Sequence, residues 1–190
     1  MKIVVRVATL ALLLPVSVHA QQGAGQANPI TGAFRARILN LHRTLAQAFD
    51  SIPEAKYSFK PTPAQQSIGF IAQHLANDNY LFCNQFGDMK HARTAKDSTT
   101  ADSVKATWPK DSLVAKLKES FAFCERAVGQ LEDAKLSEQV ALTFRGNTRQ
   151  VARASMVLAH AMDMADHYSQ IANYMRLNGM LPPTALPPPR

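Results

Sequence analysis

The apolar pattern near the end of the chain constrains the fold more than any other feature. Between Thr148 and Asn178, apolar residues recur at steps of three and four, the period of one face of an α-helix. Thr148 is a suitable N-terminal cap, and Asn178 followed by Gly179 is a typical helix end. We therefore expect one long helix here, packed through Val151, Ala154, Leu158, Met162, Ala165, Ile171, Tyr174 and Met175.

Three earlier stretches of the chain show the same period. The first spans residues 29–52. The second follows Ser67, which can cap a helix, and stops at Gly87. The third begins at Asp111 or Ser112. Four amphipathic helices without a convincing sheet predict an all-α fold, a four-helix bundle.

The connections between these helices differ in length. Residues 88–109 are polar and rich in Ser, Thr and Lys, which is typical of a long connection or lid. Residues 132–147 form an irregular link, in which residues 140–144 suit a short extended piece. The bundle is therefore expected to contain at least one long crossover connection.

The N-terminus has the pattern of a secretory signal peptide. Lys2 and Arg6 precede an apolar run over 7–15, and small residues lead to a cleavage site at Ala20. The run is too short to span a bilayer comfortably, so we expect export to the periplasm or medium and no stable membrane span after cleavage. An uncleaved anchor is the alternative. The expected parts are a signal peptide (1–20), a flexible leader (21–28), the bundle (29–180) and a Pro-rich tail (181–190).

Composition limits the class of protein. The 190 residues are 46% hydrophobic and 18% charged, which is typical of a globular domain with a real core. Removing residues 1–20 lowers the formal net charge from +7 to +5. The remaining basic residues are scattered and form no run, so we expect no nucleic-acid partner.

The chain has two cysteines, Cys83 and Cys124, each on an apolar stripe. An exported protein meets an oxidising compartment, so an even pair favours a disulfide. On the chain-entropy model, closing such a long loop stabilises the fold by about 4 kcal/mol. Two buried free thiols are the alternative.

The chemistry of the chain is concentrated on the last helix. Asp163 and His167 are four residues apart, so they share a helix face about 6 Å apart along the axis. His74, on the buried stripe of the second helix, can supply a third ligand to the same metal ion. Three protein ligands leave one position open for water or substrate. Taken singly, Asp163 also suits a solvated helix surface, and His74 a satisfied core histidine.

Four further residues are candidates for supporting roles. His160 lies seven residues before His167, too far for the same ion, and is expected to hydrogen-bond a ligand. Asp78, one turn after His74, suits a supporting carboxylate or an alternative ligand, and equally a surface charge. Gln170 and Tyr174 continue the face of His167 toward substrate or bound water, although core packing also explains Tyr174.

Two parts of the sequence resemble a known family. The string HLANDNYLFC from His74 to Cys83 resembles the second helix of DinB-like proteins, a metal-binding four-helix family. Thr148-Arg149, Leu158, and the pieces H-Y-x-Q at His167 and Y-x-R-L-N-G at Tyr174 resemble its last helix. The resemblance covers nearly all of residues 30–183.

The resemblance implies a metal site and a class of activity. DinB-like proteins bind a divalent metal through three histidines, which correspond to His74, position 163 and His167; here Asp163 replaces the usual histidine. A carboxylate still suits Zn²⁺, Ni²⁺, Mn²⁺ or Fe²⁺. The expected activity is a metal-dependent hydrolase or a thiol-type transferase acting on a small molecule. The alternative is a non-catalytic metal-binding, structural or stress-associated envelope bundle, and a homodimer is a further expectation.

Overall fold

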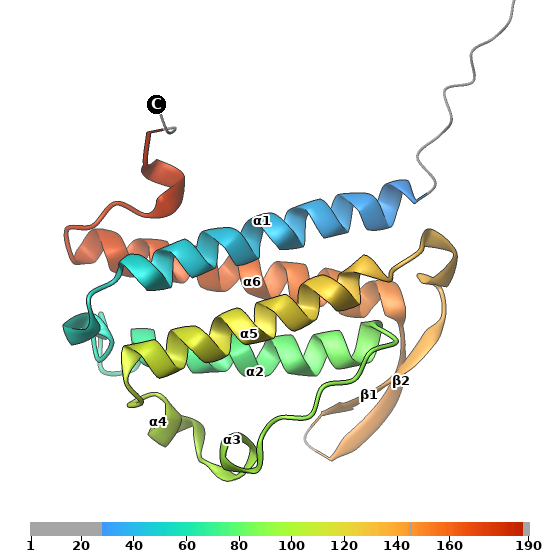
Figure 1. Cartoon of the computed structure of the whole chain (residues 1–190), viewed down its shortest axis with the longest axis horizontal. Helices are drawn as coiled ribbons and strands as arrows, with labels where there is room; N and C mark the ends of the chain where they lie inside the picture. The colour runs from blue at the N-terminus through green and yellow to red at the C-terminus, as the bar shows by residue number, and fades with distance from the viewer. Residues whose placement is uncertain (1–27, 145, 188–190) are drawn as a thin grey trace, which may run out of the picture.

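Four long helices form the body of the protein (Figure 1). The structure is a computed structural model that describes residues 28–144 and 146–187. Helices α1 and α2 each pack against both α5 and α6, so the order around the bundle is α1, α5, α2, α6. The predicted four-helix bundle is confirmed. Its long helices are α1 (Pro29–Ser51), α2 (Ile68–Phe86), α5 (Lys110–Gly129) and α6 (Arg153–Leu177).

Local signals set the ends of these helices. The Ser67 hydroxyl accepts a hydrogen bond from the backbone amide of Phe70, so Ser67 caps α2 as predicted. At the start of α1, the Asp133 carboxylate accepts hydrogen bonds from the backbone amides of Ile30 and Thr31. A carboxylate at this position satisfies free amides and complements the helix dipole. The third long helix begins at Lys110, slightly before the predicted start.

An antiparallel hairpin precedes the last helix. Strands β1 (Gln139–Phe144) and β2 (Asn147–Ala152) pair with Thr143 opposite Thr148, and their hydroxyl oxygens are 2.8 Å apart. The predicted helix start at Thr148 and the absence of a sheet were therefore wrong. Cross-strand pairing outweighed the helical period here, and α6 begins only at Arg153, whose amide donates to the carbonyl of Glu138.

The connection between α2 and α5 contains two short helices, α3 (Ala95–Thr99) and α4 (Asp102–Lys105). A buried charge network holds them in place. Lys105 is only 1% exposed, and its Nζ lies 2.8 Å from an Asp102 carboxylate oxygen and 3.5 Å from one of Asp97. Lys116 of α5 also pairs with Asp97. The predicted long connection is therefore an ordered segment anchored to the bundle.

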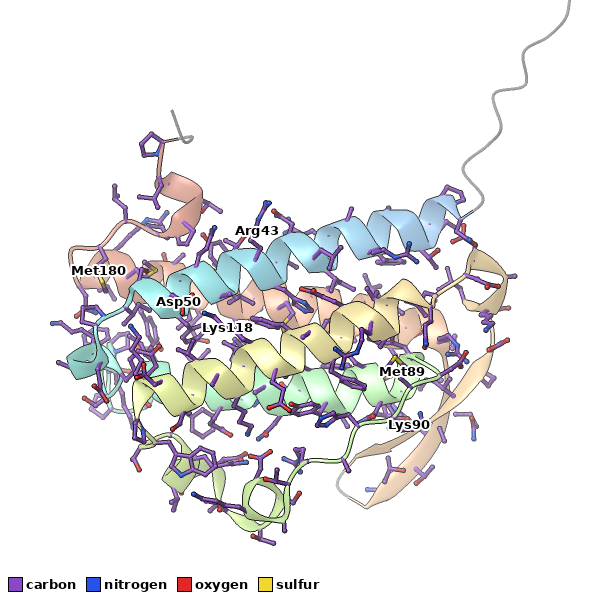
Figure 2. The ribbon with its side chains drawn as sticks, in the orientation of Figure 1. Arg43, Asp50, Met89, Lys90, Lys118 and Met180 are labelled. Carbon is purple, nitrogen blue, oxygen red and sulfur yellow. A yellow bond between two sulfur atoms is a disulfide. The ribbon has the colours of Figure 1, made fainter. Side chains whose placement is uncertain are left out.

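The apolar core has two clusters along the bundle axis. One contains Phe49, Leu75 and Leu117, and the other contains Ile38, Phe86 and Phe123. The second cluster holds a disulfide between Cys83 of α2 and Cys124 of α5, whose Cα atoms are 5.3 Å apart. Outside the core, an exposed ion pair joins Asp50 of α1 to Lys118 of α5 at 2.7 Å (Figure 2).

Three 3₁₀ turns complete the described chain: η1 (Glu54–Lys56), η2 (Asp133–Lys135) and η3 (Pro183–Ala185). None of the helices between residues 28 and 187 combines the length and the apolar character that a membrane span requires. The predicted signal peptide and most of the predicted leader lie outside the described residues, as does the end of the Pro-rich tail.

Candidate metal centre

Helices α2 and α6 bring two histidines together on one side of the bundle. The ring centroids of His74 and His167 are 5.0 Å apart, with the rings nearly perpendicular at 84°. Asp78 and Asp163 join them, and one donor atom from each of these four residues lies within 4.8 Å of the others. The two helices run in opposite directions, so His74 faces His167 while Asp78 lies on the side of Asp163. The structure therefore gathers all three predicted ligands and one further carboxylate.

Each helix contributes one histidine and one aspartate four residues apart. His74 Nε2 lies 3.1 Å from a carboxylate oxygen of Asp78, and His167 Nε2 lies 3.6 Å from one of Asp163. Residues four apart on a helix lie on the same face, so each pair converges without any special backbone geometry. Asp78, which the sequence left open between a supporting role and a surface charge, is part of the cluster.

Burial sets the electrostatics of the cluster. The side chains are partly covered, with exposed fractions of 31% for His74, 19% for Asp78, 24% for Asp163 and 10% for His167. Burial lowers the pKa of His74, and the neighbouring His167 lowers it further. Burial, then Asp163 and Asp102, raises the pKa of Asp78 to about 7. Burial also raises the pKa of Asp163. Without a cation, the site thus favours the neutral form of His74 and holds its carboxylates less ionised than usual.

The donor set fits a divalent cation. The Oδ2 atom of Asp163 is buried and has no hydrogen-bond partner within the described residues. A buried carboxylate oxygen without a partner costs free energy, and coordination to a cation removes that cost. Neutral imidazole nitrogens and carboxylate oxygens are ligands for Zn²⁺, Ni²⁺, Mn²⁺ and Fe²⁺. The residues present therefore suit a metal ion.

Gln170 orients His167. Its Oε1 lies 3.1 Å from His167 Nδ1, and its Nε2 donates to the Tyr174 hydroxyl at 3.1 Å. With the amide nitrogen bonded to Tyr174, the amide oxygen accepts the Nδ1 proton, and His167 Nε2 keeps its lone pair for a metal. These hydrogen bonds hold the imidazole in place, and both residues also line a pocket of about 420 Å³, so a contact with substrate stays a prediction.

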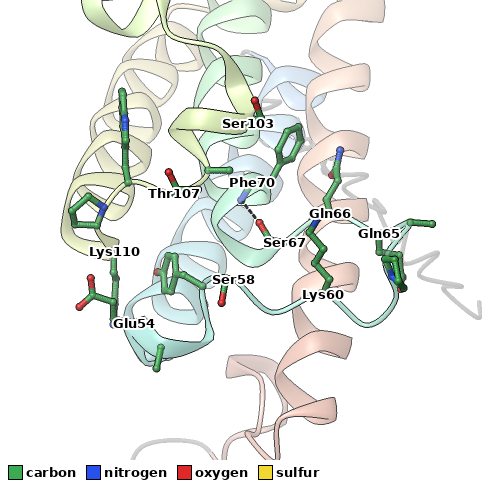
Figure 3. A pocket seen from close by; sticks show the side chains of 17 residues that line it. Glu54, Ser58, Lys60, Gln65, Gln66, Ser67, Phe70, Ser103, Thr107 and Lys110 are labelled. Carbon is green, nitrogen blue, oxygen red and sulfur yellow. Dashed lines mark hydrogen bonds between the residues drawn. The ribbon is translucent and has the colours of Figure 1, made fainter.

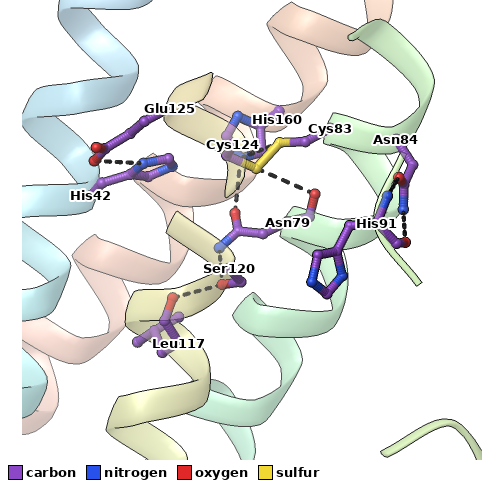
Figure 4. Close-up of a disulfide and its surroundings, with 10 residues drawn as sticks. All are labelled: His42, Asn79, Cys83, Asn84, His91, Leu117, Ser120, Cys124, Glu125 and His160. Atoms are coloured by element: carbon purple, nitrogen blue, oxygen red, sulfur yellow. Dashed lines mark hydrogen bonds and ion pairs between the residues drawn. A yellow bond between two sulfur atoms is a disulfide. The ribbon is translucent and has the colours of Figure 1, made fainter. Parts of the chain in front are cut away.

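His160 differs from the sequence expectation. It is fully buried, its Nε2 lies 2.9 Å from Asn79 Oδ1, and it faces the disulfide (Figure 4). None of its hydrogen bonds reaches the His/Asp cluster. The physical reason is distance: His160 points in nearly the same direction as His167 but lies about 10.5 Å before it along the helix axis, so it reaches Asn79 instead of the cluster.

Two residues near the cluster were not predicted from the sequence. The ring of Phe70 stacks on His74, with centroids 6.0 Å apart. Asp102 of α4 accepts a hydrogen bond from Asn77 at 3.1 Å and contributes to the raised pKa of Asp78. The link from Phe70 to His74 follows from helix spacing, but the approach of Asp102 requires the fold of the connection between α2 and α5.

A large pocket lies beside the cluster. It has a volume of about 780 Å³ and is bounded by η1, the start of α2 and the segment after α4 (Figure 3). Phe70 and Ser103 line it, together with Trp108. None of the four cluster residues is in its wall, so Phe70 separates this pocket from His74.

Solved structures share this fold at low sequence identity. A DinB-like protein from Bacillus cereus has a TM-score of 0.62 and 14% identity, over 80% of this chain and 95% of that chain. YfiT from Bacillus subtilis, described as a probable metal-dependent hydrolase with an unusual four-helix bundle topology, has a TM-score of 0.58 and 12% identity, over 79% and 88%. A mycothiol-dependent maleylpyruvate isomerase has a TM-score of 0.57 and 11% identity, over 76% and 65%. These likenesses show the fold.

Sequence comparison identifies the family. A search of curated proteins found no match. The sequence model of the DinB superfamily matches residues 38–171, a range that contains His74, Asp78, Asp163 and His167. This match covers more than half of the chain and agrees with the resemblance seen in its second and last helices, so the chain belongs to the DinB superfamily.

Proposed function

We propose that this protein binds a divalent metal ion through His74, Asp163 and His167 and uses it to hydrolyse a small-molecule substrate. The observation that carries the proposal is the convergence of two His/Asp pairs from α2 and α6, with donor atoms within 4.8 Å of one another. The fold shared with YfiT, described as a probable metal-dependent hydrolase, supports the reaction class.

Three protein ligands would leave a coordination position of the metal ion open for water or substrate. Three protein ligands are typical of reactive sites, because a further position stays open for water or substrate. A bound divalent ion supplies Lewis acidity, which lowers the pKa of water and polarises a carbonyl oxygen of the substrate. Asp78, next to His74, accepts the proton that the attacking water releases. Gln170 keeps the His167 ring in its ligating orientation.

The negative charge of carboxylates near the site affects which substrates it can bind. The carboxylates of Asp102 and Asp163 both act electrostatically on that of Asp78. Asp78 and Asp163 belong to the cluster, and together they offset the charge of a divalent ion. A neutral or cationic substrate is therefore favoured over a phosphate, which these carboxylates repel.

We also propose that the protein is exported to the periplasm or medium. The signal-peptide pattern of residues 1–20 supports this proposal, and so does the Cys83–Cys124 disulfide, because such bonds persist in oxidising compartments. Cell fractionation followed by mass measurement of the mature N-terminus tests it. A full-length chain in the cytoplasmic fraction would count against it.

Elemental analysis tests the metal site. The oxidised protein is purified from its native compartment, and its metal content is compared with that of Asp163→Asn and of the matched control Asp166→Asn. Asp166 lies on the same helix but is exposed and outside the cluster. Asp163→Asn is expected to lose metal while circular dichroism stays unchanged, and Asp166→Asn to keep it. Equal metal content in both variants would refute the site.

Activity assays then separate the functional classes. The metal-loaded protein is tested on neutral and cationic esters and amides, and in parallel on thiol-transfer reactions with low-molecular-weight thiols. Hydrolysis that is lost in Asp163→Asn supports the proposal. Thiol transfer would assign the protein to the transferase class instead, and metal binding without turnover of any substrate would favour a non-catalytic envelope bundle.

A further inference from the structure

A second cluster of metal-ligating side chains lies in the core, apart from the His/Asp cluster. Cys83 of α2, Cys124 of α5 and His160 of α6 are all fully buried. The two sulfur atoms lie 3.9 Å and 3.8 Å from His160 Nε2, and a ligating atom from each residue lies within 4.8 Å of the others. Three different helices thus meet at this point (Figure 4).

An oxygen atom completes the cluster. Asn79 Oδ1 lies 2.9 Å from His160 Nε2, and Asn79 Nδ2 donates to the Ser120 hydroxyl at 2.8 Å. Ser120 in turn donates to the Leu117 carbonyl at 2.7 Å. This chain of hydrogen bonds fixes the amide with its oxygen toward His160. The two sulfurs and the Asn79 oxygen therefore all lie between 2.9 Å and 3.9 Å from His160 Nε2.

His160 is poorly satisfied in the oxidised protein. Its Nδ1 is buried and has no hydrogen-bond partner in the part of the chain that the structure describes. Burial lowers the pKa of His160 to about 3, so the ring is neutral near pH 7. In the oxidised protein Nε2 donates its proton to Asn79 Oδ1. Once the sulfurs are no longer bonded to each other, the neutral ring can bind a metal through Nε2 by carrying its proton on the unpartnered Nδ1 instead.

We propose that reduction of the Cys83–Cys124 disulfide creates a buried, four-coordinate site for a thiophilic divalent ion such as Zn²⁺, with Cys83, Cys124 and His160 as ligands and Asn79 Oδ1 as the fourth. A dithiol reductant gives two electrons and two protons to the disulfide, breaking the S–S bond, and itself becomes a disulfide. Each cysteine thiol then releases its proton to solvent as its sulfur binds the ion.

Charge balance and ligand softness distinguish this site from the first. Two thiolates neutralise a divalent ion completely, and a neutral assembly is what a fully buried position tolerates. Sulfur ligands select Zn²⁺ and similar ions, whereas the carboxylates of Asp78 and Asp163 favour harder ones. The disulfide and the ion exclude each other, because both need the same sulfur atoms. In the oxidised protein a disulfide therefore joins α2 to α5, and in the reduced protein a bound metal ion joins them.

Cobalt spectroscopy tests the proposal independently of the first site. The His74→Ala/His167→Ala variant, which lacks the first site, is titrated with Co²⁺ before and after treatment with a phosphine reductant. The phosphine takes oxygen from water and becomes its oxide while the disulfide becomes two thiols. The oxidised variant is expected to bind no Co²⁺ at this cluster. The reduced variant is expected to bind one Co²⁺ per chain, with sulfur-to-cobalt charge-transfer absorption and intense tetrahedral d–d bands.

Two matched variants identify the ligands. In the same background, His160→Gln is expected to weaken Co²⁺ binding at least about tenfold, whereas the exposed Ser169→Ala leaves it unchanged. If reduction unfolds the chain, refolding it with Co²⁺ must restore both helicity and the charge-transfer band. Two titratable thiols without that band, in either experiment, would overturn the proposal. Because the first site is already removed, this result says nothing against the proposed function.

Discussion

The imidazole of His74 on α2 stands edge-on to the imidazole of His167 on α6, with ring centroids 5.0 Å apart. This contact joins two helices that are distant in sequence, and it places the Asp78 and Asp163 carboxylates in the same cluster.

Replacing Gln170 with Leu is expected to weaken metal binding without unfolding the protein. Gln170 accepts the Nδ1 proton of His167 and so keeps Nε2 free for coordination. Losing such a supporting hydrogen bond typically lowers metal affinity by about 10- to 100-fold. Competition with a chelator of known affinity measures the change. Ser169→Leu, at the exposed neighbouring position, serves as the control, and an equal loss in both variants would contradict the role given to Gln170.

The metal-free Asp78→Asn variant is expected to gain stability over the wild type as pH rises from about 4 to about 7. Burial raises the folded-state pKa of Asp78 from 3.8 to about 7, so in this window the folded protein holds a proton that the unfolded chain has released. The contribution of Asp78 to the free energy of unfolding therefore falls with rising pH, and Asn removes this contribution.

Urea unfolding of both metal-free proteins at several pH values measures the difference. Saturating metal provides the control, because a bound cation favours the ionised carboxylate and shrinks the pH-dependent difference. A difference in free energy that stays constant between pH 4 and pH 7 in the absence of metal would disprove the linkage.

His42→Phe is expected to make the protein less sensitive to acid. His42 is buried, stacks on Phe121 at 4.3 Å, and has its pKa lowered from 6.5 to about 2, by burial first and His160 second. Below pH 6.5 His42 is protonated in the unfolded chain but not in the folded protein, so its contribution to the free energy of unfolding becomes more unfavourable as pH falls. Phe keeps the stacking and removes the proton.

Thermal unfolding between pH 4 and pH 7 is the measurement for His42→Phe. The melting temperature of the variant should fall less steeply on acidification than that of the wild type. Parallel curves would show that His42 does not contribute to acid unfolding.

Lys105→Met is expected to destabilise the protein by about 1–3 kcal/mol, because the buried Asp97 carboxylate loses one of its two lysine partners and Asp102 loses its ion pair. Lys118→Met is the matched control. Lys118 and its partner Asp50 are each 48% exposed, so losing this pair costs about 0–1 kcal/mol. Denaturant unfolding compares the two variants, and similar losses would contradict a structural role for the buried network.

The sequence predicted what depends on local periodicity. The apolar stripes indicated four helices, Ser67 indicated the start of α2, and the four-residue spacing indicated that Asp163 and His167 share a face. The resemblance placed His74 opposite them, and the structure brings the three residues together.

The features that could not be predicted from the sequence depend on contacts between distant segments. The hairpin replaced the expected first turns of the last helix because β2 finds a pairing partner in β1. Asp78 does carry a local signal, since His74 and Asp78 repeat the spacing of Asp163 and His167 in reverse order. The direction of His160 toward Asn79 emerges only once α2 and α6 are packed.

The disulfide ties α2 to α5, but among the described residues no covalent side-chain cross-link joins α6 to the other helices. An ion bound by His74, Asp163 and His167 would cross-link α6 to α2, which the disulfide already joins to α5. Hydrogen exchange in α6 should then slow on metal loading far more than exchange in α5. The rate of hydrogen exchange in α6 would thus show whether the metal site is occupied.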